Sequence, residues 1–150
     1  MIAIASDHAA LDLKETIKAY LVELGYEYID FGTYTKDSCN YPEYAFKAAK
    51  AVAEGECEKG ILICGTGIGM SLAANKVKGI RCAVCSEPYS AKMSREHNDA
   101  NMLAFGARVV GEDLAKMIVK TWLDASFQGG RHQTRVNEIT NIENLGRPVE

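Results

Sequence analysis

The sequence predicts an α/β protein, a three-layer α/β/α sandwich around a five-stranded parallel sheet. Short apolar runs alternate with amphipathic stretches along the chain, which is typical of repeated strand-helix-strand units. The chain has 150 residues, of which 47% are hydrophobic. Because a chain of this length can bury a core of its own, we expect residues 1–150 to form a single domain.

The apolar runs are the predicted strands, and the helical periodicity lies between them. The runs cover residues 2–6, 26–31, 60–64, 80–84 and 101–105. After the first run, apolar residues recur every three or four positions from Leu11 to Leu24, and Gly25 supplies a stop. Further helices are predicted over residues 42–52, 68–75, 88–96 and 114–125.

A C-terminal helical extension is predicted at about residues 131–145, after Gly129 and Gly130. Val136, Ile139 and Ile142 recur every three residues there, so we expect one face of this helix to dock elsewhere.

Charge and cysteine content exclude several classes of protein. The 17 Lys and Arg residues against 20 Asp and Glu give a net charge of -3, so no basic field exists to hold nucleic acid or an anionic membrane. The chain has 5 cysteines, an odd number, and begins without a basic leader or a membrane-spanning apolar run. We therefore expect a cytoplasmic protein, in a reducing compartment.

A glycine-rich loop, residues 65–69, joins the third strand directly to a helix. Alternate glycines let the backbone approach a ligand, and the helix N-terminus aims free N–H groups at it. The loop therefore predicts an anion site, although tight strand-helix packing is an alternative. It departs from the dinucleotide fingerprint, because Met70 stands where the third glycine would fall, and it lacks the lysine of a P-loop.

Only one of the cysteines has a position that favours chemistry. Cys64 ends the third strand, just before the glycine loop, and is a candidate base or nucleophile, or else a small core residue. Cys82 and Cys85 have metal-site spacing, but residues three apart in a strand point to opposite faces, which favours core packing. Cys39 and Cys57 have no chemical context in the sequence.

Two polar pairs follow secondary-structure elements. Asp7 and His8 come directly after the first strand, where they could hold hydroxyls or phosphate, or where Asp7 could simply cap the next helix. His97 and Asn98 end the helix at residues 88–96 and could equally form its C-cap.

Arg131 and Arg135 lie four residues apart on one face of the tail helix. Two guanidinium groups so placed could bind one phosphate, although solvated surface arginines are the ordinary alternative.

Together these motifs resemble the type B ribose-5-phosphate isomerases, in the family that also holds allose-6-phosphate and galactose-6-phosphate isomerases. The resemblance runs from end to end of the chain. Its most specific segments are Ser6-Asp7-His8, Asp30-Phe31-Gly32-Thr33, Asn40-Tyr41-Pro42 and residues 61–69, 85–91, 97–99 and 129–132.

The resemblance implies an aldose-ketose isomerase that interconverts D-ribose 5-phosphate and D-ribulose 5-phosphate through an enediolate, without a metal or an organic cofactor. Cys64 is then the base, His97 opens the furanose ring, and Thr66 lies near the reacting oxygen. Substrate is bound by Asp7, His8, Tyr41, Gly65, Thr66, Gly67, Ile68, Gly69, Asn98, Arg108, Arg131 and Arg135.

The resemblance also implies a Rossmann-like sheet of order 2-1-3-5-4, which sets the tips of strands one and three side by side. The helix at residues 88–96 starts at that edge and runs back, so His97 is expected roughly 14 Å from Cys64. A homodimer, with dimers of dimers also open, would then have active sites shared between subunits.

Other functions stay open at this point. The substrate could be a hexose 6-phosphate, because sugar length depends on pocket depth. A nucleotide-binding module is a second class, since Glu87 lies 22 residues after Gly65 and could meet a ribose hydroxyl. A sugar-phosphate sensor without turnover is a third.

Overall fold

The computed structural model of the chain describes residues 1–149, and every predicted strand and helix is present. The strands are β1 (Ile2–Ser6), β2 (Tyr28–Asp30), β3 (Lys59–Cys64), β4 (Cys82–Val84) and β5 (Met102–Gly106). The helices are the 3-10 helix η1 (His8–Ala10), then α1 (Leu11–Glu23), α2 (Tyr41–Ala53), α3 (Ile68–Ala74), α4 (Pro88–Glu96), α5 (Glu112–Asp124) and α6 (Arg131–Leu145).

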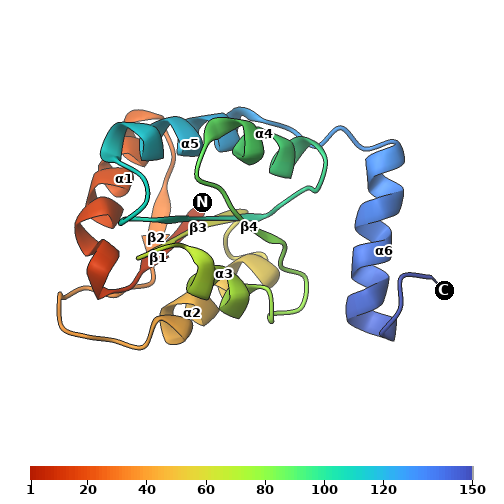
Figure 1. The fold of residues 1–150 in the computed structure, drawn as a ribbon, viewed down its shortest axis with the longest axis horizontal. Coiled ribbons are helices and arrows are strands. Elements are labelled where there is room, and N and C mark those ends of the chain that lie inside the picture. The colour runs from red at the N-terminus through yellow and green to blue at the C-terminus, as the bar shows by residue number, and fades with distance from the viewer. Residues whose placement is uncertain (150) are drawn as a thin grey trace.

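The strands form one parallel sheet in the order β2-β1-β3-β5-β4, which confirms the expected order. Helices α1, α4 and α5 cover one face, and α2 and α3 cover the other, so the three-layer sandwich is confirmed (Figure 1). Ser6 pairs with Ile63, and Cys64 pairs with Gly106. The carboxyl tips of β1, β3 and β5 therefore lie side by side.

Each central strand divides its side chains between two cores. Ile61 and Ile63 pack on the side of α1, α4 and α5, whereas Leu62 and Cys64 pack toward α2 and α3. Cys82 and Cys85 divide in the same way, and burial raises their pKa values to about 12 and about 11. These two thiols therefore stay protonated in separate cores and cannot share a metal ion.

The two edge strands are shorter than the sequence predicts, because flanking residues enter turns instead of the ladder. Before β2, the Tyr26 N–H donates to the Leu21 carbonyl and completes the end of α1. Before β4, the Ile80 N–H donates to the Val77 carbonyl, and the Arg81 N–H donates to the Asn101 side chain. An edge strand has only one neighbour to hold such residues in the sheet.

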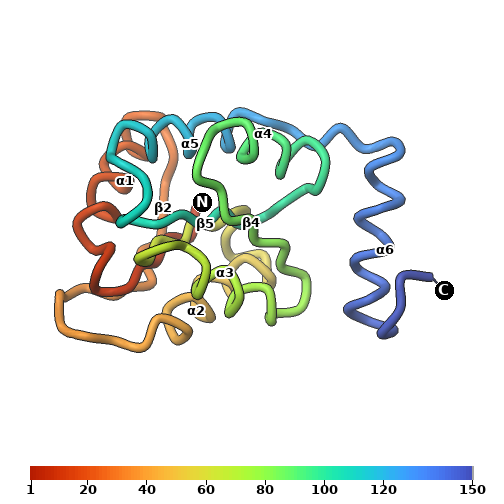
Figure 2. The backbone as a smooth tube through the Cα atoms, in the orientation of Figure 1, coloured from red at the N-terminus to blue at the C-terminus, as the bar shows by residue number. Residues whose placement is uncertain are grey.

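The tail helix α6 covers neither face of the sheet; it stands beside the β4 edge (Figures 1 and 2). Of its periodic apolar residues, Val136 is buried, whereas Ile139 and Ile142 are 46% and 51% exposed. Glu143 ties the helix to the body by accepting from the Gly79 N–H at 3.0 Å. Along residues 1–149, no helix combines the length and apolar character needed to cross a membrane.

A buried ion pair fixes the start of the loop that leads from β2 to α2. The fully buried Lys14 ammonium binds Asp30 Oδ1 at 2.7 Å and the Thr33 carbonyl. Burial opposes ionisation of Asp30, but hydrogen bonds from Lys14, the Gly32 N–H and Lys18 outweigh it and lower the carboxyl pKa. The loop carries Tyr41 at its far end, so this pair helps to position that residue.

Replacing Asp30 by alanine should destabilise the fold by about 3 kcal/mol, because it leaves the Lys14 ammonium buried with only a carbonyl partner. Asp12→Ala is the control, since it breaks an exposed pair with Lys36 and should cost no more than about 1 kcal/mol. Urea unfolding at one protein concentration measures both changes. Equal losses of unfolding free energy in the two variants would mean that the buried pair contributes no more to stability than the exposed pair.

Candidate active site

A cavity of about 500 Å³ opens at the carboxyl edge of the sheet, between the tips of β1 and β3. Most of the residues that the sequence singles out line it. The lining consists of Asp7, His8, Ala9, Tyr41, Cys64, Gly65, Thr66, Ile68, Gly69, Leu72 and Arg108. Ala9 and Leu72 were not expected there, and as apolar residues without a motif they give no signal in the sequence.

Cys64 lies at the inner end of this pocket and is 5% exposed. Its Sγ accepts a hydrogen bond from the Gly67 N–H at 3.1 Å. Gly67 has φ +82°, and a Cβ there would lie 2.8 Å from the backbone of Phe105. Only glycine fits this position without strain, so the loop holds the sulfur in place by a contact that no other residue would allow.

Some backbone N–H groups of the glycine loop and of the start of α3 already have hydrogen-bond partners, and others have none within the helix. The Ile68 N–H donates to Thr66 Oγ1 at 3.2 Å. Gly67 and Ile68 therefore already use their N–H groups inside the loop, while the first N–H groups of α3, such as that of Gly69, have no partner within the helix. Fewer donors face an anion than the sequence alone suggests.

Arg108 and Tyr41 lie against this loop from either side. The Arg108 N–H donates to the Gly65 carbonyl at 3.1 Å, and its guanidinium would be 3.5 Å from a Cβ on Gly65. A Cβ on Gly69 would lie 2.6 Å from the ring of Tyr41. The glycines thus let a cation and a phenol hydroxyl approach the backbone at the pocket wall.

Asp7 both caps η1 and lines the pocket. Its Oδ1 accepts from the Ala10 N–H at 3.1 Å, as the capping alternative predicts. The cap fixes the carboxylate at the tip of β1.

His8 is oriented by Cys39, and the expectation that Cys39 has no chemical context was wrong. The Cys39 N–H donates to His8 Nδ1 at 3.3 Å, and Cys39 Sγ lies 3.7 Å from the same nitrogen. A neutral histidine that accepts at Nδ1 carries its proton on Nε2, so it can donate into the pocket. The only signal in the sequence was that Cys39 directly precedes the Asn40-Tyr41-Pro42 segment.

His97 and Asn98 lie away from this pocket. Cys64 pairs with Gly106 at the end of β5, whereas the segment after His97 enters β5 at its other end, Met102. At about 3.3 Å per residue, the two ends of β5 are about 13 Å apart. The structure therefore places His97 at the opposite edge of the sheet from Cys64.

The arginines of the tail helix gather near His97. The rings of His97 and His132 stack, with centroids 4.2 Å apart and an interplanar angle of 11°. Partial burial and the positive charges of His97, Arg131 and Arg135 lower the pKa of His132. The predicted site residues thus form two groups, one around Cys64 and one around His97.

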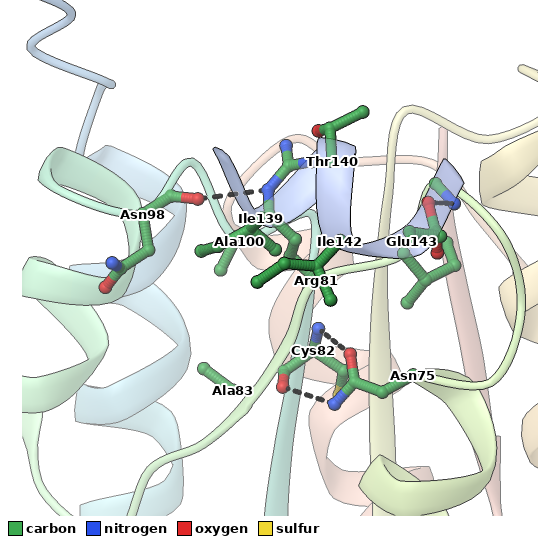
Figure 3. A pocket seen from close by; sticks show the side chains of 12 residues that line it. Asn75, Arg81, Cys82, Ala83, Asn98, Ala100, Ile139, Thr140, Ile142 and Glu143 are labelled. Atoms are coloured by element: carbon green, nitrogen blue, oxygen red, sulfur yellow. Dashed lines mark hydrogen bonds between the residues drawn. The ribbon is translucent and has the colours of Figure 1, made fainter. Parts of the chain in front are cut away.

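A second cavity, of about 520 Å³, lies between α6 and the start of β4 (Figure 3). Asn98 lines this cavity. Three of the other polar side chains bind their neighbours: Asn75 bonds to both backbone groups of Cys82, Arg81 donates to the Asn98 carbonyl, and Glu143 accepts from the Gly79 N–H. The pocket around Cys64 is therefore the stronger candidate for chemistry. In the part of the chain that the structure describes, no group of three or more metal-ligating side chains occurs.

Comparison with known proteins identifies relatives that cover 95% of the chain. The model of the ribose/galactose isomerase family matches residues 2–139. Ribose-5-phosphate isomerase B of Escherichia coli is 61% identical over 95% of both chains, and the D-erythrulose-4-phosphate isomerase of Pectobacterium atrosepticum is 47% identical over 95% of this chain and 94% of its own.

Solved structures point to the same family. Ribose-5-phosphate isomerase B of Clostridium thermocellum superimposes with a TM-score of 0.94 at 60% identity, covering 95% of this chain and 97% of its own. From the family match and these relatives, we conclude that the chain belongs to the ribose/galactose isomerase family.

Proposed function

We propose that the protein interconverts D-ribose 5-phosphate and D-ribulose 5-phosphate. The observation that carries this proposal is the 61% identity, over nearly the whole of both chains, to a ribose-5-phosphate isomerase B. The pocket supports it, because a thiol and a glycine loop meet there at the edge of the sheet. The free cysteines fit a reducing compartment, and we place the reaction in the cytoplasm.

Aldose-ketose isomerisation needs a base beside a site for negative charge. Cys64 removes the proton from C2 of the open-chain aldose and returns it to C1 of the enediolate, while a second proton passes from O2 to O1. The N–H groups in the first turn of α3 that have no partner within the helix, such as that of Gly69, stabilise the enediolate oxygen, with the Thr66 side chain close by.

The remaining pocket residues bind the sugar and its phosphate. Asp7 and Tyr41 hold hydroxyl groups, while His8 and Arg108 take the phosphate. A protein of net charge -3 needs local cations to bind a doubly charged phosphate, and Arg131 and Arg135 complete them.

The two groups of site residues lie too far apart to act on one molecule within a single subunit. We infer a two-fold dimer, in which the group around His97 of one subunit completes the pocket around Cys64 of the other. His97 would then open the furanose ring, and Asn98 would contact the sugar.

Of the alternatives, nucleotide binding has lost its main support. Glu87 accepts hydrogen bonds from the Ser90 N–H at 3.0 and 2.9 Å and caps α4, so its carboxylate is already engaged. Sugars of other lengths stay open, since the family description covers galactose and one relative is named for a four-carbon sugar phosphate.

An isomerisation assay with ribose 5-phosphate, allose 6-phosphate and galactose 6-phosphate tests the proposal. We expect the highest kcat/KM for ribose 5-phosphate, and thermal stabilisation by sugar phosphate but not by NAD, AMP or FMN. A preference for a hexose phosphate would change the substrate, and stabilisation without any turnover would indicate a sensor.

Gly106→Ala should lower turnover about tenfold or more while the protein still folds. The new Cβ would lie 2.5 Å from Thr66 Cα and 2.6 Å from the Gly65 carbonyl oxygen, so the loop beside Cys64 must move. Gly111→Ala is the matched control, because no atom of residues 1–149 beyond its chain neighbours lies within 4 Å of its Cβ position. Steady-state kinetics measure the turnover of both variants, and melting curves show whether they fold. Equal turnover of the two variants would disprove this prediction.

Arg131→Ala should weaken the binding of ribose 5-phosphate by about ten- to a hundredfold and leave the binding of free ribose nearly unchanged, because only the phosphate makes charge-assisted contacts. Arg147→Ala, at an exposed position after α6, controls for the loss of one positive charge. Titration with both ligands measures the difference. Equal losses would mean that Arg131 has a structural role.

A further inference from the structure

The segment that carries His97 and Asn98 is held by two arginines from different elements. Arg95, in the last turn of α4, donates to Asp99 Oδ1 at 3.0 Å and to the Ala100 carbonyl at 2.6 Å. Arg81, just before β4, donates to the Asn98 carbonyl at 3.0 Å (Figure 3). It also donates to the Asp99 carbonyl at 2.8 Å.

Asp99 is the centre of this arrangement. Its second carboxylate oxygen lies 3.5 Å from the Arg81 guanidinium, so one carboxylate bridges two cations. Its backbone has φ +47°, a left-handed conformation that non-glycine residues seldom adopt. Aspartate adopts this conformation more readily than most residues, and here the two arginines hold it through the Asp99 carbonyl and carboxylate.

The arginines are themselves fixed. Arg95 is 8% exposed, and its guanidinium carbon lies 5.9 Å from the centre of the Trp122 ring. Arg81 is anchored through its backbone, because its N–H donates to the Asn101 side chain and its carbonyl accepts from the Asn101 and Met102 N–H groups. These two arginines and Asp99, here called the clamp, thus connect the end of α4 to β4 and β5.

We propose that Arg81, Arg95 and Asp99 are positioning residues for ring opening. They fix the backbone on which His97 and Asn98 project from the end of α4, and so hold His97 in the orientation that a partner subunit's pocket requires. This inference rests on the proposed function. The arginines and Asp99 need not touch the substrate, and they act through His97 and Asn98.

Ring opening and proton transfer can be measured separately. To open the furanose, the C1–O4 bond breaks, O4 gains a proton from His97, and the anomeric hydroxyl loses its proton to water as C1=O1 forms. Ribulose 5-phosphate needs no such step, because the oxygen that would close its five-membered ring is esterified. Exchange of its C1 hydrogen with solvent therefore requires Cys64 but not His97.

The experiment compares net conversion of ribose 5-phosphate with deuterium incorporation at C1 of saturating ribulose 5-phosphate in D2O. In Arg81→Met and Asp99→Asn, we expect conversion to fall about tenfold or more, while incorporation stays within about twofold of wild type. Asp124→Asn is the matched control, because it breaks the same kind of i,i+4 pair, with Lys120 on α5. It should change neither rate.

Parallel loss of both rates, or no loss of conversion, would overturn the inference. If Arg81→Met does not fold, Arg81→Lys replaces it, since a lysine keeps the charge but cannot reproduce the planar fork that reaches both carbonyls. A wild-type protein that neither converts nor exchanges these sugars would refute the proposed function itself. The two failures are therefore distinguishable.

Discussion

Cys64→Ala should lower turnover of ribose 5-phosphate by about two to four orders of magnitude, the usual contribution of a placed general base. Substrate binding should persist, because the other residues that line the pocket are untouched. Cys64→Ser separates two effects of the change, since an alcohol can still accept from the Gly67 N–H but is a far weaker base at neutral pH. Steady-state kinetics and a binding titration measure both consequences.

Cys57→Ala is the matched control for this prediction. Cys57 is buried on the same side of the sheet as Cys64, and burial raises its thiol pKa, but it does not line the pocket. Its loss should leave turnover unchanged. If Cys64→Ala retains more than a tenth of wild-type turnover, Cys64 is not the base.

The layers of the fold could be predicted because they depend on local patterns. Parallel strands covered on both faces are continuous apolar runs, and β1 and β3 match this pattern over most of their length. The ends of the edge strands could not be predicted, because they depend on hydrogen bonds that no local pattern indicates. The Tyr26 N–H donates to Leu21 across a turn, and the Arg81 N–H donates to Asn101, which is 20 residues away. The order of the strands came from a family resemblance and not from any pattern.

The site was predictable only as far as chain direction determines it. Residues that follow β1 and β3 must meet at one edge, so Asp7, His8 and Cys64 could be placed together. The contact of Cys39 with His8 joins positions 31 residues apart through an irregular loop, and neither residue's neighbours indicate it. The clamp on Asp99 was equally hidden, because Arg81 reads as an ordinary charged residue at the start of a strand.

Mixing two inactive variants, Cys64→Ala and His97→Ala, should restore roughly a quarter of wild-type activity. The structure places His97 and Cys64 at opposite ends of β5, about 13 Å apart along the strand, so a site that uses both must take them from two subunits. In a mixed dimer one site then carries both defects and the other carries neither. Random pairing makes half of the dimers mixed, and half of the sites in those dimers are intact.

The variants are denatured together, refolded and assayed with ribose 5-phosphate, with each variant refolded alone as the baseline. Pairing Cys64→Ala with the double variant Cys64→Ala/His97→Ala is the control, because every site in that mixture lacks the thiol and no activity should return. Native mass spectrometry confirms that mixed dimers form. Verified mixed dimers that stay inactive would show that the two residues act from one chain, and the closed pocket would then have to bring the end of α4 across the whole length of β5.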